Sequence, residues 1–307
     1  HVHDTAKQQA LIADSLSINP FNYLCLMLKQ GDNEARDCKY EEEAYTLMHS
    51  DINNYHETAI DCMAAGIWDM ALRILGHAIE LGIATPLTRY YYAYADSINK
   101  PDNDNLWQQA SQASVDYCFP NRMEDVVVLS EALRRNPKDA TASYLLGNLY
   151  YDKRQYDVAV PHWEACTQQK PAFPTAWRNL ALAYYNKQHD AEKAVACMEK
   201  AFALDEQDAR IFMELDQLYK RLGRSCAERL EHFSRYSSLI SQRDDLTLEY
   251  ITLLNQNQRY EEAIRIIDSH IFHPWEGGEG KVSTQYQLCR IEMAKQLMRL
   301  SDAASAS

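Results

Sequence analysis

Apolar and small residues recur along this chain at the three- and four-residue spacing of amphipathic helices, and the predicted helices come in pairs. The clearest pair covers 140–171. Leu146 and Gly147 lie in its first helix, and Ala159 and Trp163 lie in its second. Small residues let two helices cross closely, and a large one fills the space beside the crossing. The pattern therefore predicts an antiparallel helix pair rather than two independent helices.

Similar pairs begin near 140, 174, 209 and 244, a spacing of about 34 to 35 residues that is typical of tetratricopeptide repeats. Earlier pairs near 18, 52 and 86 share a second phase, so we expect an atypical helix around Asp104–Val115, and a one-residue insertion near Gln188–His189. The pattern predicts an all-α chain, a right-handed tetratricopeptide-like α-solenoid. Its expected parts are N-terminal helical repeats over 1–103, a main array over 104–271, and a non-repeat loop with a C-terminal helix over 272–307.

The expected helices follow from the same periodicity and from the short polar connections between apolar stretches. They are 5–16, 20–30, 34–48, 52–65, 68–81, 86–98, 104–116, 121–135, 140–153, 156–169, 174–186, 190–203, 208–222, 226–240, 244–256, 260–271 and 282–300.

The composition and the net charge limit the classes of partner that we expect for this chain. The formal net charge is −13, and no Lys/Arg stripe is present, which argues against nucleic acid and against an anionic membrane. The longest apolar run, Tyr23–Leu28, is too short to span a bilayer. The eight cysteines form no C-x-x-C pair and mostly lie in apolar helical patterns, which favours buried free thiols and a cytoplasmic location over a disulfide framework. Because the chain begins without Met, we expect it to be part of a longer protein.

One segment does not fit the repeat: His-Pro-Trp-Glu-Gly-Gly-Glu-Gly-Lys at 273–281. Together with the segments 119–120, 150–153, 177–180, 214–220 and 228–230, it resembles the tetratricopeptide-rich part of bacterial proteins that carry a DUF5107 domain. The resemblance covers most of the chain and is densest from 119 to 282. It implies a large cytoplasmic protein in which a β-rich domain, similar to sugar-mutarotase sandwiches, precedes the repeats. It also implies a link to carbohydrate, but no particular reaction.

Polar residues on the inner helices of such an array are binding candidates, because these helices line its concave face. The candidates are Asn148, Tyr151, Arg178, Asn179, Tyr185, Glu214, Asp216 and Lys220. Arg178 offers a planar fork of donors to a carboxylate or a phosphate. Asp216 replaces a small residue, and two interpretations stay open: an internal pair with Arg178, or a ligand site. For the tyrosines, packing is favoured over stacking on a sugar ring.

The 270–281 loop is the second candidate, with His273, Trp275, Glu276 and Glu279 as its possible binding residues. A metal site of histidines and glutamates three apart would need a helix, which Pro274 and the glycine pair interrupt. Paired carboxylates for glycoside hydrolysis are a weaker alternative. We favour a docking loop in which Trp275 is the anchor.

No nucleophile elbow, phosphate-binding glycine loop or dinucleotide motif is present, so we assign no catalytic residue, no metal and no cofactor. The sequence thus predicts an interaction or scaffold module. Its expected partner is another protein, its own β-rich domain or a second copy. The alternative is part of a carbohydrate-active enzyme, in which Arg178, Glu214, Glu276 or Glu279 completes an active site shared with the missing domain.

Overall fold

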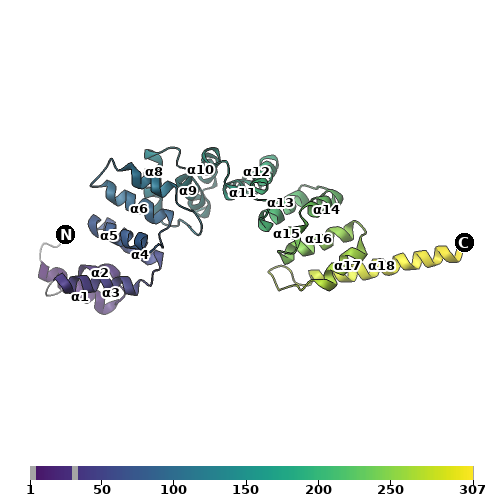
Figure 1. Ribbon diagram of the computed structural model, residues 1–307, viewed down its shortest axis with the longest axis horizontal. Coiled ribbons are helices and arrows are strands. Elements are labelled where there is room, and N and C mark those ends of the chain that lie inside the picture. Colours follow the sequence, from purple (N-terminus) through teal and green to yellow (C-terminus); the bar gives the residue numbers. More distant parts are fainter. Residues whose placement is uncertain (1–4, 30–33, 307) are drawn as a thin grey trace. The chain divides into compact units, whose positions relative to one another are not determined.

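The computed structural model describes residues 5–29 and 34–306, with backbone alone at 34–38 and 301–306. Within these residues every regular element is a helix, so the predicted all-α solenoid of tetratricopeptide type is confirmed (Figure 1). The chain divides into two compact units, 1–171 and 172–307. The predicted parts 1–103, 104–271 and 272–307 describe the phase of the repeats rather than compact units, and they stay predictions.

The first unit is built from antiparallel helices, most of which pack on their neighbours in the chain. Thus α4 packs on α5, α5 on α6, and α9 on α10. The helices are α1 Thr5–Ile18, α2 Tyr23–Leu28, α3 Glu34–Leu47, α4 Ile52–Ala64, α5 Trp68–Glu80, α6 Pro86–Ser97, α7 Asp104–Ser111, α8 Met123–Arg135, α9 Ala140–Asp152 and α10 Tyr156–Gln169.

The expected break in the repeat phase is an insertion in the first unit. The starts of α6 and α9, Pro86 and Ala140, are 54 positions apart, about 20 more than one repeat of 34 residues. The extra residues form α7 and the segment 112–122. Because α8 packs on both α6 and α9, it takes the place of the second helix in the repeat that α6 begins. The expected helix 104–116 does exist, but it ends at Ser111.

Two buried carboxylates fix to α6 the two helices that follow this insertion, α8 and α9. The Tyr91 hydroxyl donates to Asp125 Oδ1 at 2.5 Å, and Asp125 Oδ2 accepts the backbone N–H of Arg122 at 2.9 Å, at the start of α8. The Tyr90 hydroxyl donates to Asp139, which also caps α9 by accepting the N–H of Ala142 at 2.9 Å. Consecutive tyrosines of α6 therefore position two helix N-termini, where carboxylates are favoured.

The pair α9–α10 shows why the repeat needs its small and large residues. A Cβ atom at Gly147 would lie 2.4 Å from Cδ1 of the Trp163 ring, so only glycine allows this approach. The indole Nε1 of Trp163 donates to Asn148 Oδ1 at 3.1 Å. Trp163 fills the space beside the crossing, as the sequence predicts.

The second unit continues the same construction. Here α11 packs on α12, α12 on α13, α14 on α16, and α18 on both α16 and α17. Its helices are α11 Pro174–Ala183, the π-helix η1 Tyr184–Gln188, α12 Ala191–Leu204, α13 Ala209–Arg221, α14 Cys226–Arg235, α15 Ser237–Ile240, α16 Asp244–Gln256, α17 Tyr260–Ser269 and α18 Lys281–Ala306.

Three features of this unit differ from the expected helices. The one-residue insertion near 188–189 is absorbed by the π-helix η1, whose wider turns accommodate an extra residue, and it ends at His189 in a left-handed conformation with φ 56°. The expected helix 226–240 is divided at Tyr236 into α14 and α15. The last helix, α18, extends to Ala306, six residues beyond the expected end.

The structure also shows the state of the cysteines and the lengths of the apolar helices within the described residues. Seven cysteines there are free thiols, of which five are buried (Cys62, Cys118, Cys166, Cys197 and Cys289), while Cys25 and Cys226 are half-buried. Side-chain structure at Cys38 lies outside the described part. Among the helices of that part, none combines the length and the apolar content that a bilayer crossing requires.

The close approach at Gly147 gives a stability prediction. Gly147→Ala places a methyl group into the Trp163 ring, and we expect the free energy of unfolding to fall by about 1–3 kcal/mol. The matched control is Gly76→Ala in α5, where the added Cβ would lie 3.6 Å from the Tyr92 ring, an ordinary contact. There the better helix propensity of alanine should raise stability by up to about 1 kcal/mol. Urea unfolding of both variants measures the contrast, and equal effects would contradict it.

Candidate binding groove

The two candidates in the first unit are packing residues. Asn148 accepts the Trp163 indole N–H, and the Tyr151 ring lies against Tyr156 and Trp163, with ring centroids 4.9 and 5.1 Å apart. Both side chains stabilise the α9–α10 pair. This arrangement agrees with the packing interpretation for Tyr151 and gives Asn148 a structural role.

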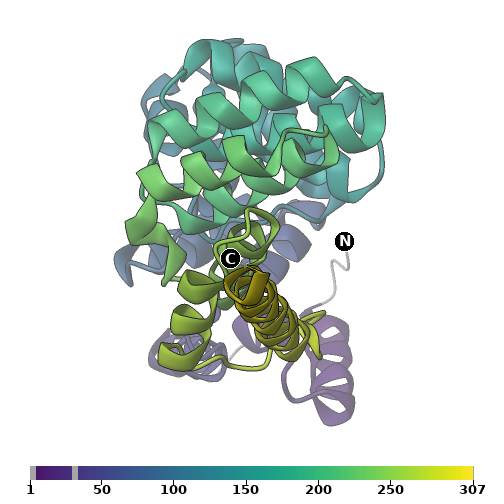
Figure 2. The same cartoon turned by 90° about the vertical axis from the view of Figure 1, so that its right-hand side faces the viewer.

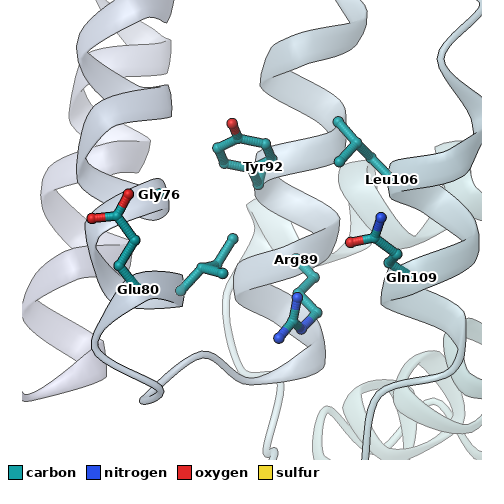
Figure 3. A pocket seen from close by; sticks show the side chains of 7 residues that line it. Gly76, Glu80, Arg89, Tyr92, Leu106 and Gln109 are labelled. Atoms are coloured by element: carbon teal, nitrogen blue, oxygen red, sulfur yellow. The ribbon is translucent and has the colours of Figure 1, made fainter.

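The first unit has a small cavity that the sequence does not reveal. It lies between α5, α6 and α7 and has a volume of about 210 Å³. The partly buried side chains of Arg89 and Tyr92 line it (Figure 3). The inserted helix α7 provides one wall through Leu106 and Gln109. A cavity that depends on an insertion cannot be found from a periodic pattern, because the insertion interrupts that pattern.

Arg178 pairs with Glu214 and not with Asp216. Its Nε and Nη2 donate to the two carboxylate oxygens of Glu214, one from α11 and the other from α13. Such a fork-to-fork pair fixes both side chains in one plane. The expected Arg178–Asp216 pair is therefore wrong, and the guanidinium of Arg178 is already occupied by an internal carboxylate.

Asp216 instead belongs to a buried ion network. It is fully buried on α13, and Arg229 of α14 donates to both of its oxygens at 2.9 and 2.6 Å. The same Nη2 of Arg229 donates to Glu249 of α16 at 2.6 Å, and Lys220 Nζ donates to both Glu249 oxygens at 2.8 and 3.0 Å. The four charges balance, and Lys220 is the one whose side chain remains 43% exposed.

Burial and pairing act in opposite directions on the two carboxylates of this network. Burial raises the pKa of Asp216 although Arg229 pairs with it. Burial opposes ionisation of Glu249 as well, but the hydrogen bonds from Lys220 and Arg229 hold its pKa below the usual value. Glu249 therefore presents a charged, doubly paired carboxylate at neutral pH.

The non-repeat loop is fastened to the start of α16 by Asp244. Its carboxylate pairs with His270 Nε2 at 2.7 Å and accepts the backbone N–H of His273 at 2.9 Å. His273 also reaches Asp244 through Nδ1 at 3.2 Å, so this side chain serves the tether although it is exposed. Further along, the Trp275 ring covers Gly278, where an added Cβ would lie 2.4 Å from the ring. The glycine thus allows the indole to fold over the loop backbone.

The loop forms one wall of a groove with α13, α16 and the start of α18. The groove has a volume of about 490 Å³. Its lining consists of Met213, Gln217, Lys220, Asp245, Leu248, Glu249, Thr252, Trp275, Glu276, Gly277, Lys281, Thr284 and Gln285. Three predicted site residues, Lys220, Trp275 and Glu276, meet here. Glu279 is exposed and does not line the groove.

A second, more apolar compartment of about 320 Å³ adjoins the groove at Gln217, which lines both. Ala181, Leu182, Met198 and Leu218 supply its apolar lining. The predicted residues Tyr185 and Glu214 also line it, and Arg221 lies over the Tyr185 ring at 5.7 Å. Asn179 and Arg178, both half-buried on α11, line neither compartment.

Most charged groups in the groove have internal partners. Asp245 accepts from Arg243, and Glu249 accepts from Lys220 and Arg229. Within the described part of the chain, the side chains of Gln217, Glu276 and Lys281 have no such partner, so they can bind a ligand. The described residues contain no cluster of three or more His, Cys, Asp or Glu that could hold a metal ion.

Comparison with known protein families identifies the type of repeat in part of the chain. A family model described as tetratricopeptide repeat matches residues 128–159 and 144–209. Residues 128–209 are tetratricopeptide repeats. They include α9–α12, the pairs around the Gly147–Trp163 contact and the π-helix.

Two solved structures are among those to which this chain is similar. A structure of MamA from Desulfovibrio magneticus RS-1, residue 41 to the end, is 26% identical, and the match covers 60% of this chain and 92% of that one with a TM-score of 0.35. TTC0263, described as a thermophilic TPR protein in Thermus thermophilus, is 18% identical over 66% of this chain and 98% of its own, with a TM-score of 0.36. At such scores the repeat match and the helix pairs carry the fold assignment.

The buried network gives a second stability prediction. Arg229→Met leaves the Asp216 and Glu249 carboxylates without their shared donor, and we expect the free energy of unfolding to fall by about 3–5 kcal/mol. The double variant Asp216→Leu with Arg229→Met removes the uncompensated charge and should be less destabilised than Arg229→Met alone, since Lys220 still pairs with Glu249. Chemical unfolding of the two variants tests this order, and a double variant that is as unstable as Arg229→Met, or less stable, would refute the coupling.

Proposed function

We propose that this chain is a protein-interaction module and that the groove in residues 172–307 binds an extended polypeptide. The observation that carries the proposal is that Gln217 lines both compartments, so they are neighbours on α13. The apolar compartment can accept an aliphatic or aromatic side chain, and the polar groove can satisfy backbone amides beyond it. Tetratricopeptide repeats that present a surface to a partner fit this arrangement.

The charge balance of the groove supports recognition by hydrogen bonds. The network at its floor is neutral, and the remaining unpaired charges, Glu276 and Lys281, have opposite signs. An amide such as Gln217 can donate to one backbone carbonyl and accept from one backbone N–H. Trp275 adds an amphipathic ring at the rim, a residue type that often anchors interfaces.

The resemblance to the repeat region of DUF5107-domain proteins suggests which polypeptide this is. We propose that a β-rich domain of the same protein is the physiological partner, with a separate protein or a second copy as the other candidates. Five buried free thiols agree with a reducing compartment, and we therefore keep the cytoplasm as the proposed location.

The test is a selection of random displayed peptides on the full chain. We expect enriched peptides, and loss of at least about tenfold in their affinity for the variant Thr252→Arg, whose long side chain occupies the groove. The matched control is Thr46→Arg in α3. Each threonine hydroxyl donates to the carbonyl four residues earlier in its helix, so both variants remove the same local bond. Absence of enrichment, or equal loss in the two variants, would reject the groove.

Carbohydrate handling is a second candidate, favoured by the presence of Trp275 and Glu276 in one groove. Its enzymatic form needs two available carboxylates. The other two that line the groove, Asp245 and Glu249, are both held in ion pairs. If the full-length protein hydrolyses glycosides with this groove, Glu276→Gln should abolish turnover while Glu279→Gln leaves it intact. Unchanged turnover in Glu276→Gln would exclude the groove as the active site.

A further inference from the structure

Two apolar surfaces are left uncovered by the repeat packing, one in each unit. The first, the helix patch, is on α18 from Ile291 onward and consists of Ile291, Leu297, Met298 and Leu300, with side chains 52–68% exposed. The second, the insertion patch, follows α7 in the first unit and consists of Tyr117, Phe119, Met123 and Val127, which are 55–90% exposed. Clusters of exposed large apolar residues often mark interaction surfaces, whereas single exposed apolar residues are common on any protein.

The helix patch lies on a part of α18 without support from its own unit. The first half of the helix is anchored to α16, where Cys289 Sγ donates to Asn255 Oδ1 at 3.0 Å and Asn255 donates to the Gln285 side chain at 2.9 Å. Residues 294–300 are all exposed, and the helix runs past α17 (Figure 1) and is seen nearly end-on in Figure 2. A short helical stretch with large exposed apolar residues gains most of its stability from packing, so a partner that covers it is expected.

The insertion patch is held outward by the local backbone. Tyr117 lies in a turn with a left-handed backbone, φ 55°, and both it and Phe119 are exposed, whereas Cys118 and Pro120 are buried. Met123 and Val127 follow one helical turn apart on α8, so they share a face of that helix. None of these four exposed side chains contributes to the repeat core.

The charges around the two patches are opposite. Arg290, Lys295 and Arg299 are near the helix patch, and so are two acidic residues, Glu292, which pairs with Lys295, and Asp302. The insertion patch has the exposed residues Asp116 and Glu124 beside it, and its one basic neighbour, Arg122, pairs with Glu57. In a chain whose formal net charge is −13, this basic apolar helix is an exception. Its complement in both charge and apolar character is the insertion patch.

We infer that the helix patch of one molecule binds the insertion patch of a second copy, head to tail. The contact is heterologous, because different surfaces of the two copies meet, so further copies can add at either end. Ile291 and Leu300 lie on opposite sides of the helix, so one partner covers only part of the helix patch, and we expect a small interface and weak, reversible association. This interaction is independent of the binding groove and uses none of its residues.

Sedimentation velocity of the full chain over a micromolar concentration series tests the inference. We expect the wild-type chain to associate, and higher salt to weaken the association. The helix variant Leu297→Gln with Leu300→Gln and the insertion variant Phe119→Gln with Met123→Gln should each weaken it by at least about tenfold. A mixture of these two variants retains one intact helix patch and one intact insertion patch, so it should form a 1:1 dimer that does not grow.

The control is Leu11→Gln with Ile18→Gln, which removes two other exposed apolar side chains from α1 and should leave association unchanged. Circular dichroism confirms that each variant is folded. A wild-type chain that stays monomeric, or a mixture that stays monomeric, overturns the inference. So does loss in the helix variant alone, which would indicate pairing of two α18 helices, and binding of the helix patch to phosphatidylserine vesicles without self-association.

Discussion

The arrangement of the second unit depends on the buried contact between Arg229 and Asp216. A carboxylate fully enclosed between helices must be paired, since an isolated buried charge is strongly destabilising. Arg229 supplies the pair from the partner helix of the same repeat and extends it to Glu249 in the next repeat. One guanidinium thus fixes three helices. Because apolar residues of similar volume are often as stabilising as a buried ion pair, the network contributes orientation more than stability.

That orientation determines which polar groups the groove can offer. Lys220 and Glu249 are held against each other, so neither can turn to meet a ligand of arbitrary charge. Recognition is left to Gln217 and to the loop residues Trp275 and Glu276, which the Asp244 tether brings over the helices. A neutral floor with few available partners favours specificity through hydrogen-bond geometry over long-range electrostatic attraction.

The sequence predicts the repeats well because their residues report local packing. The spacing of small, large and apolar positions predicts most helices to within a few residues. The pairing of the candidate site residues was harder to predict. Glu214 and Asp216 are two positions apart on α13, which is a rotation of about 200° around a helix, so they face opposite sides. Sequence alone could not say which of them meets Arg178. The Asp244 tether was missed because it depends on the conformation of a loop that follows no period.

The regular stacking of the repeats also explains where the chain leaves apolar and polar side chains without a packing partner. Each repeat buries its apolar faces and pairs its backbone groups against equivalent neighbours, so a regular stretch leaves little available for a partner. The insertion, the 270–280 loop and the free half of α18 have no such neighbours. The cavity at α7, the groove wall formed by Trp275 and the two uncovered apolar patches all occur at these places. Most of the candidate binding surfaces thus lie where the repeat is interrupted. The apolar compartment is the exception, because helices of the regular array, α11, η1, α12 and α13, line it.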